Sequence, residues 1–117
     1  MKIEKNAKDL DMTEAILDAG ICGFKTTIQV DSEDQQTAKI NLESGCPHIM
    51  KMAEEISTID AYSECFGKPG NGSIYSAAAE HCAHAACPIA PAIIKAVEVE
   101  CNLALPKQVS LSIEKKD

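Results

Sequence analysis

The chain has 117 residues, which suffices for one compact domain and is too short for two of ordinary size. Eighteen acidic residues outnumber eleven lysines, there is no arginine, and the net charge is -7. The sequence also has no tryptophan and only four other aromatic residues. Because nucleic-acid recognition relies on arginine contacts, phosphate neutralisation and base stacking, we expect no nucleic-acid partner.

Six cysteines are the most informative feature of the composition, and the cellular compartment decides how they are interpreted. The N-terminal segment 1–9 lacks the apolar core and cleavage pattern of a signal peptide, and no apolar run reaches the roughly 18 residues of a membrane span. We therefore expect a cytoplasmic protein with no membrane partner. In a reducing cytoplasm, thiols serve as metal ligands, as catalytic or redox groups, or as small buried side chains more often than as disulfides.

The N-terminal part of the chain predicts a tail followed by strands. Residues 1–12 are charged and weakly patterned, which indicates a tail or an edge strand, and we assign residues 13–114 to a single α+β cysteine-rich domain. From Thr13 to Val30 we expect one strand with an irregularity at Gly20–Gly23. After the polar turn 31–36, a second strand is expected, so the two form an antiparallel hairpin. Their apolar faces are formed by Phe24, Thr26, Ile28 and Val30, and by Ala38, Ile40 and Leu42.

Helices are predicted from Cys46 onward. Apolar residues at helical spacing predict a helix from Cys46 to Ile56 and a short one over 60–66. The loop Gly67–Gly72 lacks the ending of a phosphate-binding loop, so we interpret it as a surface loop, with Ser73 as the N-cap of the next helix. That helix is expected to reach residue 85, with His81 and Cys82 on its buried face. A longer helix over 89–103 is stopped by Pro106.

The final segment predicts another strand, because Val109, Leu111 and Ile113 alternate with polar residues. The order of elements predicts an α+β fold: a small antiparallel sheet, made of the N-terminal hairpin plus this C-terminal strand, packed on one face by three to four helices.

Cys46 is the first candidate for chemistry. The proline that follows it favours the first position of a helix, so Cys46 falls at the N-cap, where the helix dipole favours the thiolate. A thiolate binds metals and attacks electrophiles. The alternative is a capping cysteine without chemistry.

The segment His81–Pro88 holds four candidate donors within seven positions: His81, Cys82, His84 and Cys87. Its spacing differs from the paired knuckles of zinc ribbons and from the cysteine run of ferredoxins. The alternative is that His81 and Cys82 are core residues of an alanine-rich helix face.

The other cysteines divide into one further candidate and two packing residues. Cys22 is flanked by glycines, which mark a bulge or a close approach to a ligand, so it is a plausible fourth ligand; the alternative is a small buried side chain. Cys101 extends the apolar stripe of the last helix, and Cys65 lies beside the loop. We interpret both as structural.

The sequence also resembles known small domains. Four segments resemble an uncharacterised family of small cysteine-rich proteins from anaerobic microbes over residues 13 to 113: Ala19–Phe24, Cys46–His48, His81–Pro88 and Ala92–Glu100. This resemblance implies that Cys22, Cys46, Cys82 and Cys87 belong to one set. The segment Ser44–His48, after the hairpin, is more remotely similar to TSCPD-type and NifU-like small domains, in which a sheet and helices present cysteines. Neither resemblance implies an activity.

Three functions remain open from the sequence. The first is a metal- or iron–sulfur-binding module, with Cys22, Cys46, Cys82 and Cys87 as ligands of an iron–sulfur cluster or zinc, and His81, His84 or His48 replacing a thiolate or supporting one. The second is a thiol-dependent enzyme or redox protein with Cys46 as nucleophile and a histidine as base. The third is a structural or interaction domain with inert thiols. A homodimer and an electron- or metal-transfer partner are compatible with the first.

Overall fold

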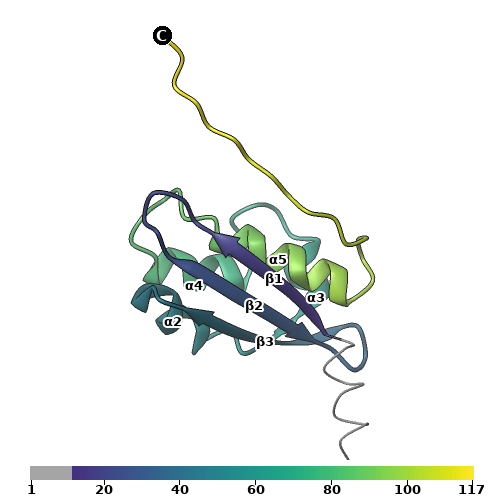
Figure 1. Ribbon diagram of the computed structural model, residues 1–117. Helices are drawn as coiled ribbons and strands as arrows, with labels where there is room; N and C mark the ends of the chain where they lie inside the picture. The colour runs from purple at the N-terminus through teal and green to yellow at the C-terminus, as the bar shows by residue number, and fades with distance from the viewer. Residues whose placement is uncertain (1–11) are drawn as a thin grey trace, which may run out of the picture.

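The computed structural model describes residues 12–117, in which a four-stranded antiparallel sheet is covered on one face by helices (Figure 1). The expectation of a tail or edge strand at residues 1–12 lies, apart from Met12, outside the described residues. The α+β class and the helices on the sheet are confirmed. In chain order the elements are β1 (Thr13–Asp18), β2 (Lys25–Asp31), β3 (Thr37–Ser44), α2 (Pro47–Ala53), β4 (Thr58–Asp60), α3 (Ala61–Cys65), α4 (Ser73–His81) and α5 (Ile89–Glu100).

The strands lie in the order β1-β2-β3-β4, and every neighbouring pair is antiparallel. The predicted hairpin is β2 and β3, with Ile28 opposite Leu42 and Val30 opposite Ile40. These four side chains are buried, as the alternation of apolar and polar residues requires of a sheet covered on one face.

The core lies between this face of the sheet and helices α2, α4 and α5. Its largest fully buried side chains include Ile28 of the sheet, Met52 of α2, Ile74 of α4, and Ile89 and Ile93 of α5. Helix α5 packs against β1 and β2, while α2 packs against β3 and α4. The connecting segments between these strands and helices therefore lie together at the ends of the sheet and of the helices.

The expected single strand from Thr13 to Val30 is instead two antiparallel strands, β1 and β2. The chain reverses through Gly20–Gly23, where the Gly23 amide donates to the Gly20 carbonyl at 2.9 Å. Both glycines have positive φ angles, 94° and 79°, which other residues rarely adopt. The glycines that suggested an irregularity therefore form a complete turn.

Three helices end earlier than their apolar periodicity predicts, and one of them is α5, which was expected to reach residue 103 and ends at Glu100. Helix α2 ends at Ala53, although Ile56 beyond it is still buried. Helix α4 ends at His81, because Cys82 adopts an extended conformation with φ −74° and ψ 139°. Ala85, expected on the buried face, is exposed. His81 and His84 are therefore not on successive turns of one helix.

Helix α4 also begins differently from the expectation. Ser73 is its first residue and Gly72 is the N-cap. The acceptor is the buried Glu64 carboxylate of α3, which accepts hydrogen bonds from the Ser73 amide at 2.9 Å and the Ile74 amide at 3.1 Å. A side chain from a neighbouring helix thus accepts the amide hydrogen bonds at the start of α4 that were expected to go to a serine cap.

The prediction of a C-terminal strand in the sheet is wrong. Within the part of the chain that the structure describes, residues 105–117 belong to no helix or strand, and they extend away from the domain (Figure 1). Val109, Leu111 and Ile113 are 63 to 84% exposed. Their alternating pattern is that of a strand, but none of the strands within residues 12–117 lies beside them to supply the hydrogen bonds. The fourth strand is instead β4, a three-residue segment that pairs with β3.

Candidate metal centre

The four cysteines singled out from the sequence line one cavity of about 580 Å³. They come from three separate connections: Cys22 from the β1–β2 turn, Cys46 from the passage between β3 and α2, and Cys82 and Cys87 from the segment between α4 and α5. All six cysteines of the chain are free thiols. The fold therefore gathers four thiols that are up to 65 positions apart in the sequence.

Cys22 lies at the exposed side of this cavity. It is one of the two central residues of the turn closed by the Gly23–Gly20 hydrogen bond, and a further bond from the Gly20 amide to the Asp18 carboxylate, at 3.2 Å, supports that turn. The Cys22 side chain is exposed, whereas the other three thiols are half-buried. Of the four cavity thiols, that of Cys22 is therefore the most accessible from outside.

Cys46 is the N-cap of α2, as expected, and Pro47 occupies the first turn. Its amide donates to Ser44 Oγ at 3.1 Å, and its carbonyl accepts from the Met50 amide at 3.1 Å. Among the described residues its thiol makes no capping hydrogen bond. The backbone of Cys46 is thus fixed at both sides, and its sulfur is available to the cavity.

Cys82 and Cys87 bracket the short passage from α4 to α5. The Cys82 amide still donates to the Ala78 carbonyl at 2.9 Å, so Cys82 is the C-cap of α4. The Cys87 amide donates to the His84 carbonyl at 3.2 Å, which closes a turn. Pro88 and Pro91 do not disrupt α5, since Pro88 is its N-cap and Pro91 falls in its first turn, where amides have no intrahelical partner.

The surroundings of the Cys82 thiol in the cavity raise its pKa. Burial first, and then the neighbouring Cys87 and Cys46 thiols, raise the pKa of Cys82 to about 11. The Cys87 and Cys46 thiols therefore lie close enough to Cys82 to disfavour a negative charge on its sulfur.

The thiols are nevertheless more widely spaced than one metal ion requires. Among the described residues, no three cysteine sulfurs lie within 4.8 Å of one another. Four thiolates around a single zinc, with Zn–S bonds of about 2.3 Å in a tetrahedron, have sulfurs about 3.8 Å apart. An iron–sulfur cluster distributes its cysteines over separate iron atoms and accommodates a wider set.

The rest of the cavity wall is mostly apolar. His48 and His84 are its two imidazoles, and both are exposed. Phe24, expected on the core face of its strand, lies at this wall instead, with its ring over Gly45. An apolar wall limits water around bound metals and favours sulfur ligands. The other lining residues are Ala19, Ile21, Pro47, Ile49, Ala83, Ala86 and Pro88.

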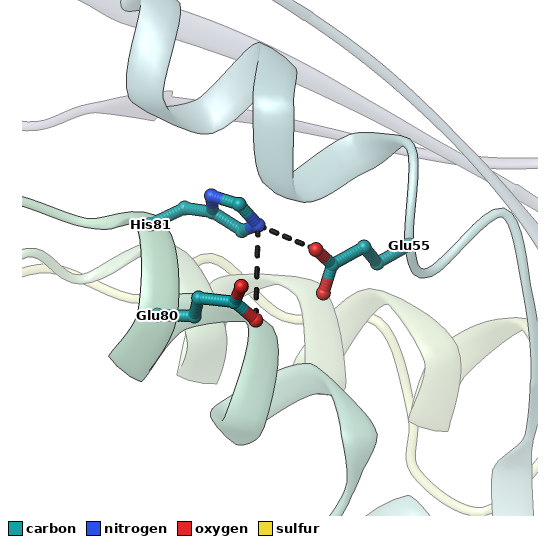
Figure 2. A network of polar contacts seen from close by, with 3 residues as sticks. All are labelled: Glu55, Glu80 and His81. Carbon is teal, nitrogen blue, oxygen red and sulfur yellow. Dashed lines mark hydrogen bonds and ion pairs between the residues drawn. The ribbon is translucent and has the colours of Figure 1, made fainter.

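His81 is not among the residues that line the cavity. Its Nε2 lies 2.5 Å from a carboxylate oxygen of Glu55 and 4.0 Å from one of Glu80, as Figure 2 shows. The three side chains place their donor atoms within 4.8 Å of one another, so they form a second group able to hold a cation. Both carboxylates are exposed to water, so we expect this group to bind a cation more weakly than the half-buried thiols do. The sequence did not predict Glu55 as a partner of His81.

Cys65 and Cys101 lie outside the cavity, as expected for packing residues. The Cys65 thiol points toward the Ile94 carbonyl of α5 at 4.0 Å, and burial raises the pKa of Cys65 to about 12. Cys101 is buried in the core at the end of α5, and burial raises its pKa as well. Both thiols therefore stay protonated at neutral pH.

Comparison with known proteins gives a family without an assigned activity. The model of a family of unknown function, DUF6951, matches residues 13–113. This range agrees with the extent of the resemblance to an uncharacterised family, while no TSCPD-type or NifU-like similarity is shown. A match was found neither among curated proteins nor among solved structures. Within residues 12–117, none of the helices has the length and apolar character needed to cross a bilayer.

Proposed function

The chain belongs to this family of unknown function, and we propose from its own residues that it is a metal-binding module whose centre is held by the thiolates of Cys22, Cys46, Cys82 and Cys87. The observation that carries the proposal is the convergence of these four thiols, from three connections of the fold, on one cavity. Cysteines placed only for packing have no reason to share a wall, and Cys65 and Cys101 do not.

The ligand chemistry favours an iron–sulfur cluster over a single zinc ion. Thiolates are the usual ligands of both. The wide spacing of the sulfurs and the apolar wall suit a group larger than one ion. His48 and His84 reach the same wall and are available to replace a thiolate or to hydrogen-bond to one, whereas the contact of His81 with Glu55 directs it elsewhere.

A bound cluster would supply one-electron transfer, and the chain would supply its position and surroundings. Cys46, Cys82 and Cys87 lie at helix ends or in a turn with fixed backbone hydrogen bonds, so they hold three corners rigidly. Exposed Cys22 is the corner from which a partner protein, an electron or metal donor or acceptor, reaches the centre. A cytoplasmic location, where thiols stay reduced, fits this chemistry.

The test is metal and acid-labile sulfide analysis, with an absorption spectrum, of protein purified without oxygen. We expect a bound centre in the wild type and its loss in Cys46→Ala and Cys87→Ala. Cys65→Ala is the matched control, since it removes a half-buried thiol outside the cavity and should keep the centre. Glu55→Gln is the second control: it breaks the His81 group without touching a cavity thiol.

Each other outcome has a clear meaning. Protein that is stable, folded and free of metal and sulfide overturns the proposal. Loss of metal in Glu55→Gln together with retention in Cys46→Ala moves the site to Glu55, Glu80 and His81.

A second function, a thiol-dependent enzyme with Cys46 as nucleophile, is favoured by the two imidazoles in the same wall. It predicts metal-free protein in which iodoacetamide labels Cys46 selectively at neutral pH.

A further inference from the structure

The C-terminal segment 105–117 has the pattern of a strand but pairs with none of the described strands β1 to β4. Val109, Leu111 and Ile113 alternate with Ser110, Ser112 and Glu114, and the three apolar side chains are 63, 84 and 84% exposed. Apolar and polar residues that alternate with period two are typical of an extended segment with one buried face. The family match runs to Ile113, the last of these apolar residues, so the segment is part of the domain.

The β1 edge of the sheet is the place where the core is incompletely covered. β1 is an edge strand, and its inward-facing Ala15 and Leu17 are half-buried although they pack on the core. The corresponding residues of β2, such as Ile28 and Val30, are completely buried. Helix α5 lies across β1 and β2. A further strand beside β1 would therefore bury its apolar side chains against α5 and complete this edge.

The exit of the segment directs it away from its own β1. At the end of α5, Asn102 has a positive φ of 61°, and the amides of Leu103 and Ala104 donate to the Glu98 carbonyl at 2.8 and 3.2 Å. Pro106 then restricts Leu105 to extended geometry. The segment consequently leaves the domain and runs out into solvent (Figure 1).

Charge favours a second copy of the chain as the partner. Residues 105–117 carry three lysines and two acidic side chains, whereas residues 12–104 carry five lysines and thirteen acidic side chains. On the outer face of β1, Glu14 and Asp18 are exposed on either side of Ile16, which is 71% exposed. The lysines, Lys107, Lys115 and Lys116, lie on either side of residues 108–114, whose one charged side chain is Glu114, and these flanking lysines are complementary to the acidic side chains of β1 in another copy.

We propose that residues 108–114 of one copy form an additional strand along β1 of a second copy, with Val109, Leu111 and Ile113 toward α5 of that copy. Reciprocal exchange of two such segments gives a closed two-fold dimer. Main-chain hydrogen bonds to the edge supply affinity, and the alternating side chains set the register. The inference is independent of the metal centre, whose cavity residues end at Pro88.

The test is the mass of the full chain in sedimentation equilibrium over a range of concentrations. We expect a dimer of twice 12.5 kDa for the wild type and a monomer for Leu111→Asp. Ser112→Asn is the control, because it changes a polar side chain on the opposite face of the segment without adding charge beside Glu14 and Asp18, and it should leave the dimer intact. Circular dichroism checks that each variant is folded.

Hydrogen exchange then identifies the surface. In the dimer we expect slow exchange at residues 109–113 and at β1 amides, and in Leu111→Asp both become fast. A monomeric wild type overturns the proposal, including one in which the segment is protected by its own chain. A dimer that survives Leu111→Asp, or one in which β1 exchange is unchanged, overturns it equally, since another surface then holds the copies together.

Discussion

Replacing Glu64 by alanine should destabilise the domain strongly, because this buried carboxylate caps α4 from a neighbouring helix. Its oxygens accept hydrogen bonds from the Ser73 amide at 2.9 Å, the Ser73 hydroxyl at 2.6 Å and the Ile74 amide at 3.1 Å. Glu64 is 7% exposed, and its negative charge lies at the positive end of the helix dipole. Gly72, the N-cap, has no side chain that could take over.

The magnitude follows from what each donor can find instead. Ile74 is completely buried, so its amide loses its acceptor at a cost of about 1 to 3 kcal/mol. Ser73 is exposed and water replaces part of its two bonds, which leaves a capping loss of about 0.5 to 2 kcal/mol. We expect Glu64→Ala to lower the free energy of unfolding by about 2 to 4 kcal/mol, a large share of the stability of a small domain.

The assay is urea unfolding of reduced, metal-free protein at neutral pH, followed by circular dichroism. Glu64→Gln, which keeps one acceptor oxygen, should lose less than Glu64→Ala. Ser73→Ala, which removes the hydroxyl bond and keeps both amide bonds, should lose the least. A change below about 0.5 kcal/mol in Glu64→Ala, the range of an ordinary surface substitution, would refute the reasoning. An equal loss in Ser73→Ala would assign the effect to the hydroxyl.

Three other predictions concern the same scaffold. Gly72→Ala should lower the free energy of unfolding in urea more than Gly70→Ala does. Both glycines have positive φ, which alone costs about 1 to 2 kcal/mol for other residues, but a Cβ at Gly72 would also lie 2.7 Å from Glu64 Oε1. Equal losses in the two variants would contradict this. Burial raises the pKa of Cys65 from 9.0 to about 12, so the folded state retains a proton that the unfolded state loses, and the free energy of unfolding should fall as pH rises above 9. Cys65→Ala should reduce this fall, and an unchanged pH dependence would show that Cys65 is not its source. Removing the bound centre with a chelator should lower the melting temperature of the wild type and leave that of Cys46→Ala unchanged, since a ligand stabilises only the state that binds it; equal shifts would place the metal elsewhere.

The sheet could be predicted from the sequence where its signal is local. The alternation around Ile28 and Ile40 identifies β2 and β3, because buried and exposed positions follow directly from the pleat. The division of β1 from β2 was missed because two glycines inside an apolar alternation are compatible with a bulge as well as a turn. The three-residue β4, with Ile59 as its single buried residue, carries no periodicity to detect.

Helix ends and caps were predicted less well, because tertiary contacts decide them. Nothing between His81 and Cys87 breaks a helix by its propensity, yet α4 ends at His81, where the imidazole meets Glu55. The Glu64 cap joins residues nine and ten positions apart across a loop, so no local pattern reveals it. The strand predicted from the C-terminal alternation is not formed, because an alternating pattern becomes a strand only beside another strand, and none of the described strands pairs with residues 105–117.

The candidate site was predictable to the level of its cysteines. Glycine neighbours for Cys22, a following proline for Cys46 and Cys87, and a histidine neighbour for Cys82 separated these four from Cys65 and Cys101, and the cavity contains the same four. Of the three histidines, His48 and His84 lie in the cavity wall and His81 does not, because the direction of its side chain depends on where α4 ends.

X-ray absorption at the edge of the bound metal, on protein purified without oxygen, tests the four-thiolate centre most directly. The account predicts a first shell of sulfur neighbours in the wild type, retained in Cys65→Ala and lost with the metal in Cys87→Ala. A first shell dominated by oxygen and nitrogen would place the metal at Glu55, Glu80 and His81, and folded protein without any bound metal would contradict the metal centre altogether.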